Sequence, residues 1–124
     1  MEKSSEEVHL ISRWKIKNGY QKEAEKVLVQ FEERARNEPG TLSYLIHRPM
    51  WDIDLVSKPT PSQLEVLFYE RYANKEAFLS HVNGQKEFMR AHGYFEYFVP
   101  PPNSPGSASE MVEFLRLERG YLQK

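Results

Sequence analysis

Three short segments decide how this chain folds: EPGTLSY at residues 38–44, FYERY at residues 68–72 and NKEAFLSH at residues 74–81. The pair Pro39-Gly40 is expected to end a helix, because proline cannot continue one and glycine tolerates a left-handed exit. The alternating and aromatic-rich residues that follow predict two strands. The third segment predicts a helix that begins at an asparagine N-cap and ends on a histidine.

Hydrophobic periodicity indicates the remaining elements. Alternation predicts strands at 8–16, 42–46, 64–72 and 111–117, and helical spacing predicts helices at 20–38, 74–81 and 88–98. This β-α-β-β-α-β order is typical of an α+β, ferredoxin-like fold, with a four-stranded antiparallel sheet and helices on one face. The 124 residues form one domain with polar termini at 1–7 and 119–124 and long loops at 50–63 and 100–109.

Apolar side chains fall on both faces of the predicted sheet. Val66 and Phe68 point one way, whereas Leu67 and Tyr69 point the other. The second face also receives Ile11, Leu45 and one of Phe114 or Leu115. Two helices cover only one face, so a second copy of the chain is the commonest cover for the other, and we expect a homodimer. A monomer with some exposed apolar residues is the alternative.

Composition argues against several classes of function. The formal net charge of −1 gives no electrostatic reason to expect nucleic acid or a membrane surface as a partner. The chain has no cysteine, which removes disulfides and thiolate chemistry, and its four histidines show no metal-ligand spacing. No apolar run approaches the length of a membrane span and the first residues are polar, so we expect a cytoplasmic protein.

Together these segments resemble the antibiotic biosynthesis monooxygenase family of dimeric α+β barrels. In that family the first helix ends in Glu-Pro-Gly, and the next strand carries a tyrosine two residues after an apolar position. The third strand ends in an aromatic-Glu-aromatic alternation, and a short helix carries an Ala-aromatic pair followed by a histidine. The matching residues here are Glu38-Pro39-Gly40, Leu42 with Tyr44, Phe68-Glu70-Tyr72, Ala77-Phe78 and His81. The resemblance spans about residues 8–98 and the last strand.

The resemblance implies a monooxygenase without a metal or organic cofactor, acting on a small electron-rich aromatic such as a quinol, phenol or anthrone with molecular oxygen. His81 lies on the sheet-facing side of its helix and is the expected base or hydrogen-bond partner. Tyr44 and Ser12 are expected as secondary polar contacts. The aromatic residues expected to line a flat cleft are Trp14, Tyr44, Phe68, Tyr72 and Phe88. Trp51 is interpreted as a lid over that cleft or a plug at the dimer contact.

Other interpretations remain open. His81 is alternatively a core histidine satisfied by Glu70 or a backbone carbonyl, and the aromatic residues are alternatively simple core. Glu70 is a candidate general base, but the sequence favours a salt bridge from it to Arg71, Arg48 or Arg13 or a cap for the next helix.

Two further functions come from the same family pattern. His92 resembles the axial histidine of haem-degrading members and is also a candidate substrate contact. Ser12 and His81, however, stand where that branch has an asparagine and a tryptophan, which weakens the haem interpretation. The alternative from another class is a non-catalytic, ligand-sensing dimer that uses the same cleft.

Overall fold

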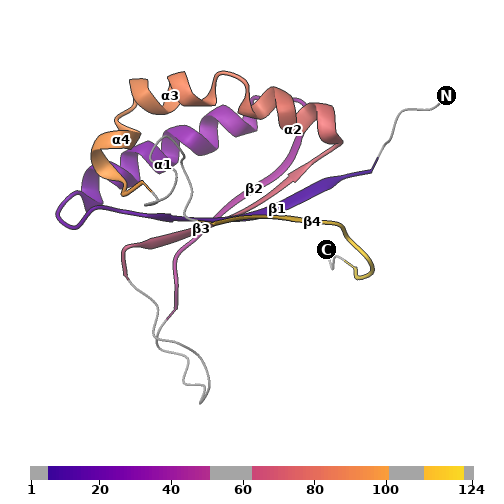
Figure 1. Ribbon diagram of the computed structural model, residues 1–124, viewed down its shortest axis with the longest axis horizontal. Coiled ribbons are helices and arrows are strands. Elements are labelled where there is room, and N and C mark those ends of the chain that lie inside the picture. Colours follow the sequence, from indigo (N-terminus) through magenta and orange to yellow (C-terminus); the bar gives the residue numbers. More distant parts are fainter. Residues whose placement is uncertain (1–5, 51–62, 101–110, 122–124) are drawn as a thin grey trace, which may run out of the picture.

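The computed structural model describes residues 6–50, 63–100 and 111–121 (Figure 1). The elements in chain order are β1 (Val8–Lys15), α1 (Gln21–Arg36), β2 (Thr41–His47), β3 (Glu65–Tyr72), α2 (Lys75–Val82), α3 (Gln85–Ala91), α4 (Tyr94–Tyr97) and β4 (Met111–Leu115). The strands form one antiparallel sheet in the order β2-β3-β1-β4, and the described helices lie on one side of it. The predicted α+β, ferredoxin-like fold is confirmed. Trp51 and nearly all of the two predicted long loops lie outside the described residues.

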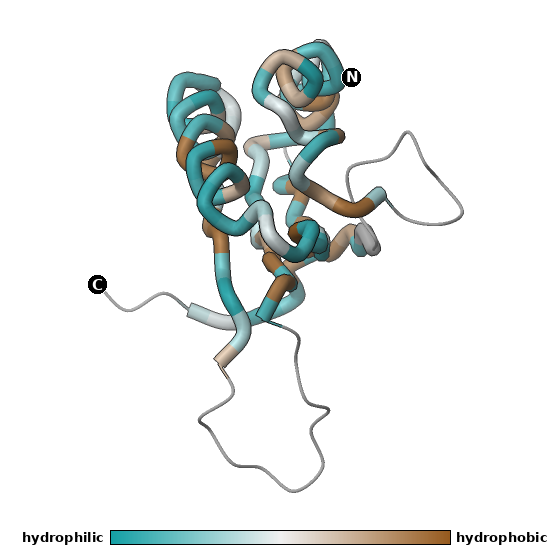
Figure 2. The backbone as a smooth tube through the Cα atoms, turned by 90° about the vertical axis from the view of Figure 1, so that its left-hand side faces the viewer, coloured by the Kyte–Doolittle hydropathy of each residue, from teal (hydrophilic) through white to brown (hydrophobic). Residues whose placement is uncertain are grey.

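The hydrophobic core lies between the helices and the sheet. Alternate residues of β1 and β3 face the helices, among them Trp14 and Phe68, whose ring centroids are 4.3 Å apart. The predicted apolar stripe of α1 is buried against them, and Figure 2 shows hydrophobic positions recurring between hydrophilic ones along the helices. Trp14 also meets Phe31, Tyr94 and Phe98 edge-on. Aromatic side chains therefore make up the centre of the core.

The helix α1 ends at Arg36, whereas the sequence predicted that it would continue to Glu38, directly before Pro39. The amide of Asn37 donates from its side chain to the Glu33 carbonyl at 3.0 Å. A residue that precedes a proline avoids the helical conformation, because the proline ring clashes with it. Glu38 therefore lies in the α1–β2 turn and not in the helix.

The predicted single helical stripe over 88–98 is wrong. The chain breaks at Gly93, which has φ +82° and separates α3 from α4. A left-handed residue interrupts a helix, and glycine adopts this conformation without steric cost. The break lets Tyr94 stack on Phe98 with 4.9 Å between the ring centroids, and both are buried, whereas Ala91 is exposed.

The other face of the sheet carries no helix among the described elements (Figure 1). Ile11, Leu67 and Tyr69 point to this open face, and Leu45 is 50% exposed there. Leu115 joins them, whereas Phe114 pairs with Leu10 on the helix side and lies 5.2 Å from the ring of Phe78. The predicted second apolar face is thus present. No helix in the described parts of the chain is long and apolar enough to cross a membrane.

The helix α2 is pressed against the α1–β2 turn. A Cβ atom built on Gly40 would lie 2.4 Å from the Cβ of Ala77, so no side chain fits at this position. The Ala73 amide donates to the Gly40 carbonyl at 2.9 Å. Asn74 caps the helix as predicted, because its side-chain oxygen accepts from the Ala77 amide at 2.8 Å.

We expect Gly40→Ala to lower the free energy of unfolding by about 1–3 kcal/mol, measured by denaturant unfolding. Gly40 is not among the glycines with positive φ, so the loss comes from overlap with Ala77 and not from backbone strain. Ala77→Gly in the Gly40→Ala background removes the opposing methyl group and should show a favourable coupling in a double-mutant cycle. An unchanged midpoint for Gly40→Ala would contradict this tight packing.

Candidate functional site

His81 is the centre of a buried polar cluster between α2 and the sheet. Its side chain is 4% exposed, and its Nδ1 atom lies 2.7 Å from Oε1 of Glu38. Its Nε2 atom lies 3.9 Å from Oε1 of Glu70. The rings of Tyr72 and Tyr44 lie beside the imidazole, with centroids 5.2 and 5.8 Å from it. These five residues are called the His81 cluster below.

Glu38 reaches the cluster from the α1–β2 turn. The hydroxyl of Thr41 donates to its Oε1 atom at 2.8 Å, and Nη1 of Arg34 lies 3.6 Å from Oε2. Arg34 also donates from Nη2 to the His81 carbonyl at 2.9 Å. The last carbonyls of a helix have no hydrogen-bond partner within the helix. Arg34 therefore binds both the C-terminal end of α2 and the carboxyl group of Glu38.

Glu70 reaches the cluster from β3. The hydroxyl of Tyr72 donates to Oε1 of Glu70 at 2.5 Å, and Glu70 is 6% exposed. The predicted salt bridge to Arg71, Arg48 or Arg13 is wrong, because these arginines pair with Glu7, Glu25 and Glu65. Strand alternation explains the difference, since Glu70 faces the helices while Arg71 and Arg13 face the open side.

Burial controls the protonation of the cluster. Burial raises the pKa of Glu70 to about 7, with a smaller increase from nearby Glu38, while the Tyr72 hydrogen bond opposes the change. Burial lowers the pKa of His81, and the hydrogen bond to Glu38 opposes that change. Burial, with the carboxylates of Glu70 and Glu38, raises the pKa of both Tyr44 and Tyr72, so the two phenols stay protonated. Near neutral pH the cluster therefore offers a neutral imidazole next to a carboxyl group that can hold or release a proton.

The structure brings some of the predicted site residues together. Tyr44 and Tyr72 flank His81. The ring of Tyr44 also packs against the ring of Phe68, with 5.6 Å between the two centroids. Phe68 and Trp14 are fully buried in the core. Ser12 is buried on β1, opposite Phe68 in the strand register.

Phe88 and His92 lie further along the helices. The guanidinium of Arg34 lies 5.2 Å from the centroid of the Phe88 ring, so Phe88 is linked to the cluster through Arg34. The His92 ring packs on Phe88 at 4.3 Å between centroids. His92 lines a separate cavity of about 410 Å³ between α1 and the α3–α4 region, with charged residues that include Lys26 and Arg90.

Sequence reasoning missed Glu38, Thr41 and Arg34 as members of the site. The sequence patterns placed Glu38 only in the Glu-Pro-Gly motif that ends the first helix. The signal that could have found it is the joint occurrence of Glu-Pro-Gly and the inward-facing histidine in one motif set. A buried histidine needs a hydrogen-bond partner, and a glutamate beside an extended turn is a suitable one.

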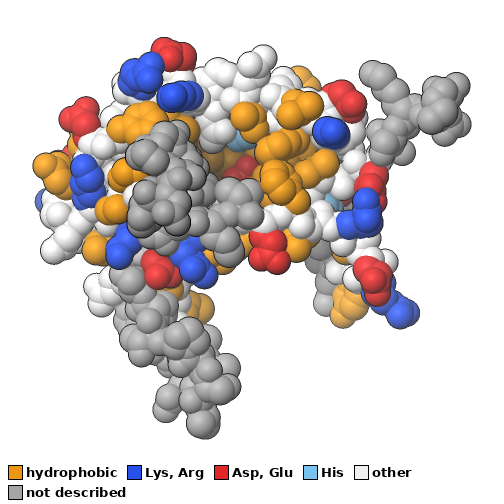
Figure 3. Space-filling model, viewed as in Figure 1, with side chains coloured by type: hydrophobic (Ala, Val, Ile, Leu, Met, Phe, Trp, Pro, Cys, Tyr) orange, Lys and Arg blue, Asp and Glu red, His pale blue; other side chains and the backbone are white. Residues whose placement is uncertain are grey.

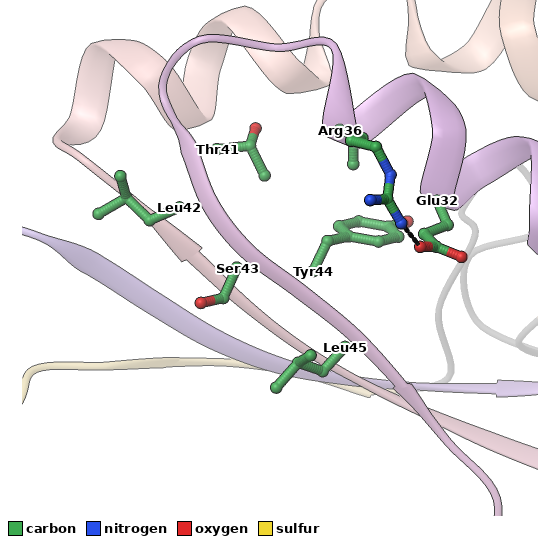
Figure 4. A pocket seen from close by; sticks show the side chains of 8 residues that line it. Glu32, Arg36, Thr41, Leu42, Ser43, Tyr44 and Leu45 are labelled. Atoms are coloured by element: carbon green, nitrogen blue, oxygen red, sulfur yellow. Dashed lines mark hydrogen bonds and ion pairs between the residues drawn. The ribbon is translucent and has the colours of Figure 1, made fainter. Parts of the chain in front are cut away.

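Two cavities lie beside the His81 cluster. The first, of about 360 Å³, opens between the end of α1 and the edge strand β2 (Figure 4). Tyr44 and Thr41 form its inner wall, and the Glu32–Arg36 ion pair stands across it from Leu45. Tyr44 and Thr41 are also the residues that contact His81 and Glu38. This cavity is therefore separated from the cluster by one layer of side chains.

The second cavity, of about 550 Å³, lies between α2 and the β1–β4 edge. Its apolar lining comes from Val8, Phe78, Leu79, Phe114 and Leu115, and the charged residues of its lining are Glu6, Glu7, Lys75, Glu76 and Arg116. The Phe78 ring lies 5.4 Å from the ring of Tyr72, so the cavity adjoins the cluster. Figure 3 shows hydrophobic side chains gathered on this side of the molecule. Within the described residues no group of three or more histidines and carboxylates could hold a metal ion.

Comparison with known proteins identifies the family. The family model for antibiotic biosynthesis monooxygenases matches residues 7–93, which include Glu38, Glu70 and His81. The chain belongs to the antibiotic biosynthesis monooxygenase family. This confirms the resemblance inferred from the motifs. No curated protein matches the chain.

Solved structures of similar fold come from several bacteria. A Caulobacter crescentus protein described as a "putative antibiotic biosynthesis monooxygenase" is 19% identical, with a TM-score of 0.61 over 93% of this chain and 92% of that one. A protein of unknown function from Nitrosomonas europaea is 16% identical, with a TM-score of 0.67 over 97% of both chains. At these identities the similarity to solved structures shows the fold alone. The family fold thus extends over nearly the whole chain, including β4.

We expect Glu70→Gln to stabilise the protein more at pH 8 than at pH 5. Folding raises the pKa of Glu70 from 4.5 to about 7, so the folded state binds more protons than the unfolded state between these values. Stability therefore falls as pH rises through this window and stays reduced above it. Glutamine cannot ionise, so the difference in unfolding free energy between variant and wild type should grow by about 2 kcal/mol from pH 5 to pH 8.

Denaturant unfolding at several pH values measures this difference. Glu65→Gln, on the open-face side of the same strand, is the matched control and should show no comparable growth. A difference for Glu70→Gln that does not change with pH would contradict the raised pKa.

Proposed function

We propose that this protein is a cofactor-independent monooxygenase that oxidises an electron-rich aromatic compound such as a quinol, phenol or anthrone. The observation that carries the proposal is the His81 cluster, in which a neutral imidazole lies 3.9 Å from a carboxyl group that titrates near neutral pH. Membership of the antibiotic biosynthesis monooxygenase family supports the reaction class. The aromatic surroundings of the cluster suit a flat substrate.

The apolar cavity beside Phe78 is the proposed substrate site. Its volume of about 550 Å³ lies within the usual range for small-molecule pockets, and its side-chain lining is largely apolar. Phe78 and Phe114 would pack on the rings of the substrate. The hydroxyl or enol of the substrate would point past Phe78 toward Nε2 of His81.

The chemistry needs no added reductant, because the substrate supplies the electrons. His81 takes a proton from the substrate, and the resulting anion donates electrons to molecular oxygen, forming a carbon–oxygen bond. The peroxide takes up the proton held by His81, and neutral His81 then accepts the hydrogen that remains on the oxygenated carbon as a proton while the O–O bond breaks. The proton on His81 afterwards passes to Glu70, which restores both groups. For an anthrone the products are a quinone carbonyl and one water molecule. Glu70 in its protonated form donates to the departing hydroxide.

A non-catalytic ligand-binding role is the second candidate. The observation in its favour is the nearly complete burial of His81 and Glu70, which suits a structural hydrogen-bond network. Haem binding through His92 is not proposed, because the cavity that His92 lines is bordered by Glu23, Lys26, Arg90 and Glu96.

We expect oxygen-dependent turnover of at least one compound in a panel of quinols, phenols and anthrones. His81→Ala should lower kcat by about 100-fold or more, as removal of a general base does, without loss of the folded circular dichroism spectrum. The control is His47→Ala, which changes an exposed histidine on β2. Equal product with and without oxygen, or full activity of His81→Ala, would contradict the proposal. Measured binding without turnover, changed in His81→Ala, would favour the ligand-binding role.

We also propose that two copies pack through their open sheet faces. Leu45, Leu67 and Leu115 present an apolar surface there that the described helices leave uncovered. A dimer would remove this surface from water, as expected for a sheet that is apolar on both sides.

Light scattering tests this assembly. We expect wild type to run as a dimer and Leu45→Glu to run as a monomer or to weaken association strongly, because a charge would be buried against the partner. Val29→Glu is the matched control, since Val29 on α1 is 51% exposed and Leu45 is 50% exposed. A monomeric wild type, or equal effects of the two substitutions, would contradict the proposed interface.

A further inference from the structure

Glu38 has no part in the proposed reaction, yet it makes the closest polar contact of His81. The contact joins Oε1 of Glu38 to Nδ1 of His81 at 2.7 Å. The Thr41 hydroxyl donates to the same oxygen at 2.8 Å, and Arg34 lies 3.6 Å from the other oxygen. The hydroxyl and the guanidinium both bring donor groups to Glu38, so its two oxygens act as acceptors here.

A carboxylate can only accept a hydrogen bond. The Nδ1 atom of His81 must therefore carry the hydrogen that lies between it and Glu38. In a neutral imidazole the lone pair then resides on Nε2. This atom is 3.9 Å from Glu70, which is too far for a direct hydrogen bond and leaves the lone pair available.

The backbone holds this geometry from both sides. Gly40 follows Glu38 by two residues and packs on Ala77, four residues before His81. Arg34 precedes Glu38 by four residues and donates to the carbonyl of His81 at 2.9 Å. The turn that carries Glu38 and the helix that carries His81 are therefore locked together on both sides of the Glu38–His81 hydrogen bond.

We propose that Glu38 is a positioning residue that holds His81 in the Nδ1-protonated tautomer and so makes Nε2 the atom that accepts the substrate's proton. The reaction assigned to Nε2 rests on the proposed function, whereas the tautomer does not. The other tautomer would present an N–H group to the substrate and could not act as a base. Once a proton is transferred, the charge of Glu38 also stabilises the imidazolium.

The tautomer can be measured directly by long-range ¹H–¹⁵N correlation spectra of the histidine rings at pH 7.5. His81→Ala identifies the His81 signals by their loss. In wild type we expect Nδ1 to be protonated and Nε2 to be unprotonated. In Glu38→Ala we expect the Nε2-protonated form to appear, because the acceptor for Nδ1–H is gone. Thr41→Val, which disturbs the turn but retains the carboxylate, should keep the wild-type tautomer.

A pH titration of the same signals gives a second readout. The charged or titratable groups that face His81 are Glu38, Glu70, Arg34, Tyr44 and Tyr72. Glu38→Gln preserves the shape of the side chain and removes its charge, so the pKa of His81 should fall below its wild-type value. This variant keeps the inference testable if Glu38→Ala does not fold.

The inference is overturned if His81 keeps Nδ1 protonated in Glu38→Ala, or if its pKa is unchanged in Glu38→Gln. A substrate found by the panel adds a kinetic test, in which Glu38→Ala should lower kcat by about 100-fold or more with little change in KM. A changed tautomer in a protein that turns over no substrate would overturn the proposed function and leave the positioning role standing.

Discussion

Gly40 and Ala77 pack at a separation that leaves no room for a side chain on residue 40, and this contact sets the position of α2 against the α1–β2 turn. This close packing brings the turn that carries Glu38 within reach of His81 on the helix. The 2.7 Å contact between Glu38 and His81 is therefore a consequence of backbone packing as much as of side-chain chemistry. The two most distinctive motifs of the sequence meet here and form one physical unit.

Burying the Glu70 carboxyl group and the His81 imidazole, with Glu38 half-buried beside them, costs free energy that the core must offset. The aromatic centre around Trp14 supplies apolar burial next to the cluster. Hydrogen bonds hold both carboxyl groups, with Tyr72 donating to Glu70 and Thr41 donating to Glu38. A network of this kind is rigid and specific when its members are satisfied, and it is sensitive to removal of any one of them. The raised pKa of Glu70 is the measurable sign of the remaining cost.

The two ring nitrogens of His81 have different surroundings in this arrangement. Glu38 is held by Thr41 and Arg34 and anchors His81 from the side of the turn, whereas Nε2 of His81 faces Glu70 on the sheet. The apolar cavity at Phe78 and the smaller one at Tyr44 lie on opposite sides of the cluster. A rigid anchor on one side and open volume on the other is the geometry that a positioned base requires.

The sequence by itself determined the elements of this protein, because those depend on neighbours along the chain. Alternation on β1 and β3, the stripe of α1 and the cap at Asn74 are local patterns, and they predicted the fold and the inward orientation of His81 correctly. The resemblance to the family was visible for the same reason, since its motifs are short and ordered.

Only the tertiary structure decided which groups meet. Glu38 and His81 are 43 residues apart, and no local rule pairs them. The sequence favoured an arginine partner for Glu70, but the pleat turns Arg71 to the opposite face and leaves Tyr72 as the donor. The contacts of Tyr94 and Phe98 with Trp14, far earlier in the chain, were likewise beyond local patterns. Such contacts arise from the packing of distant segments, which periodicity along the chain does not encode.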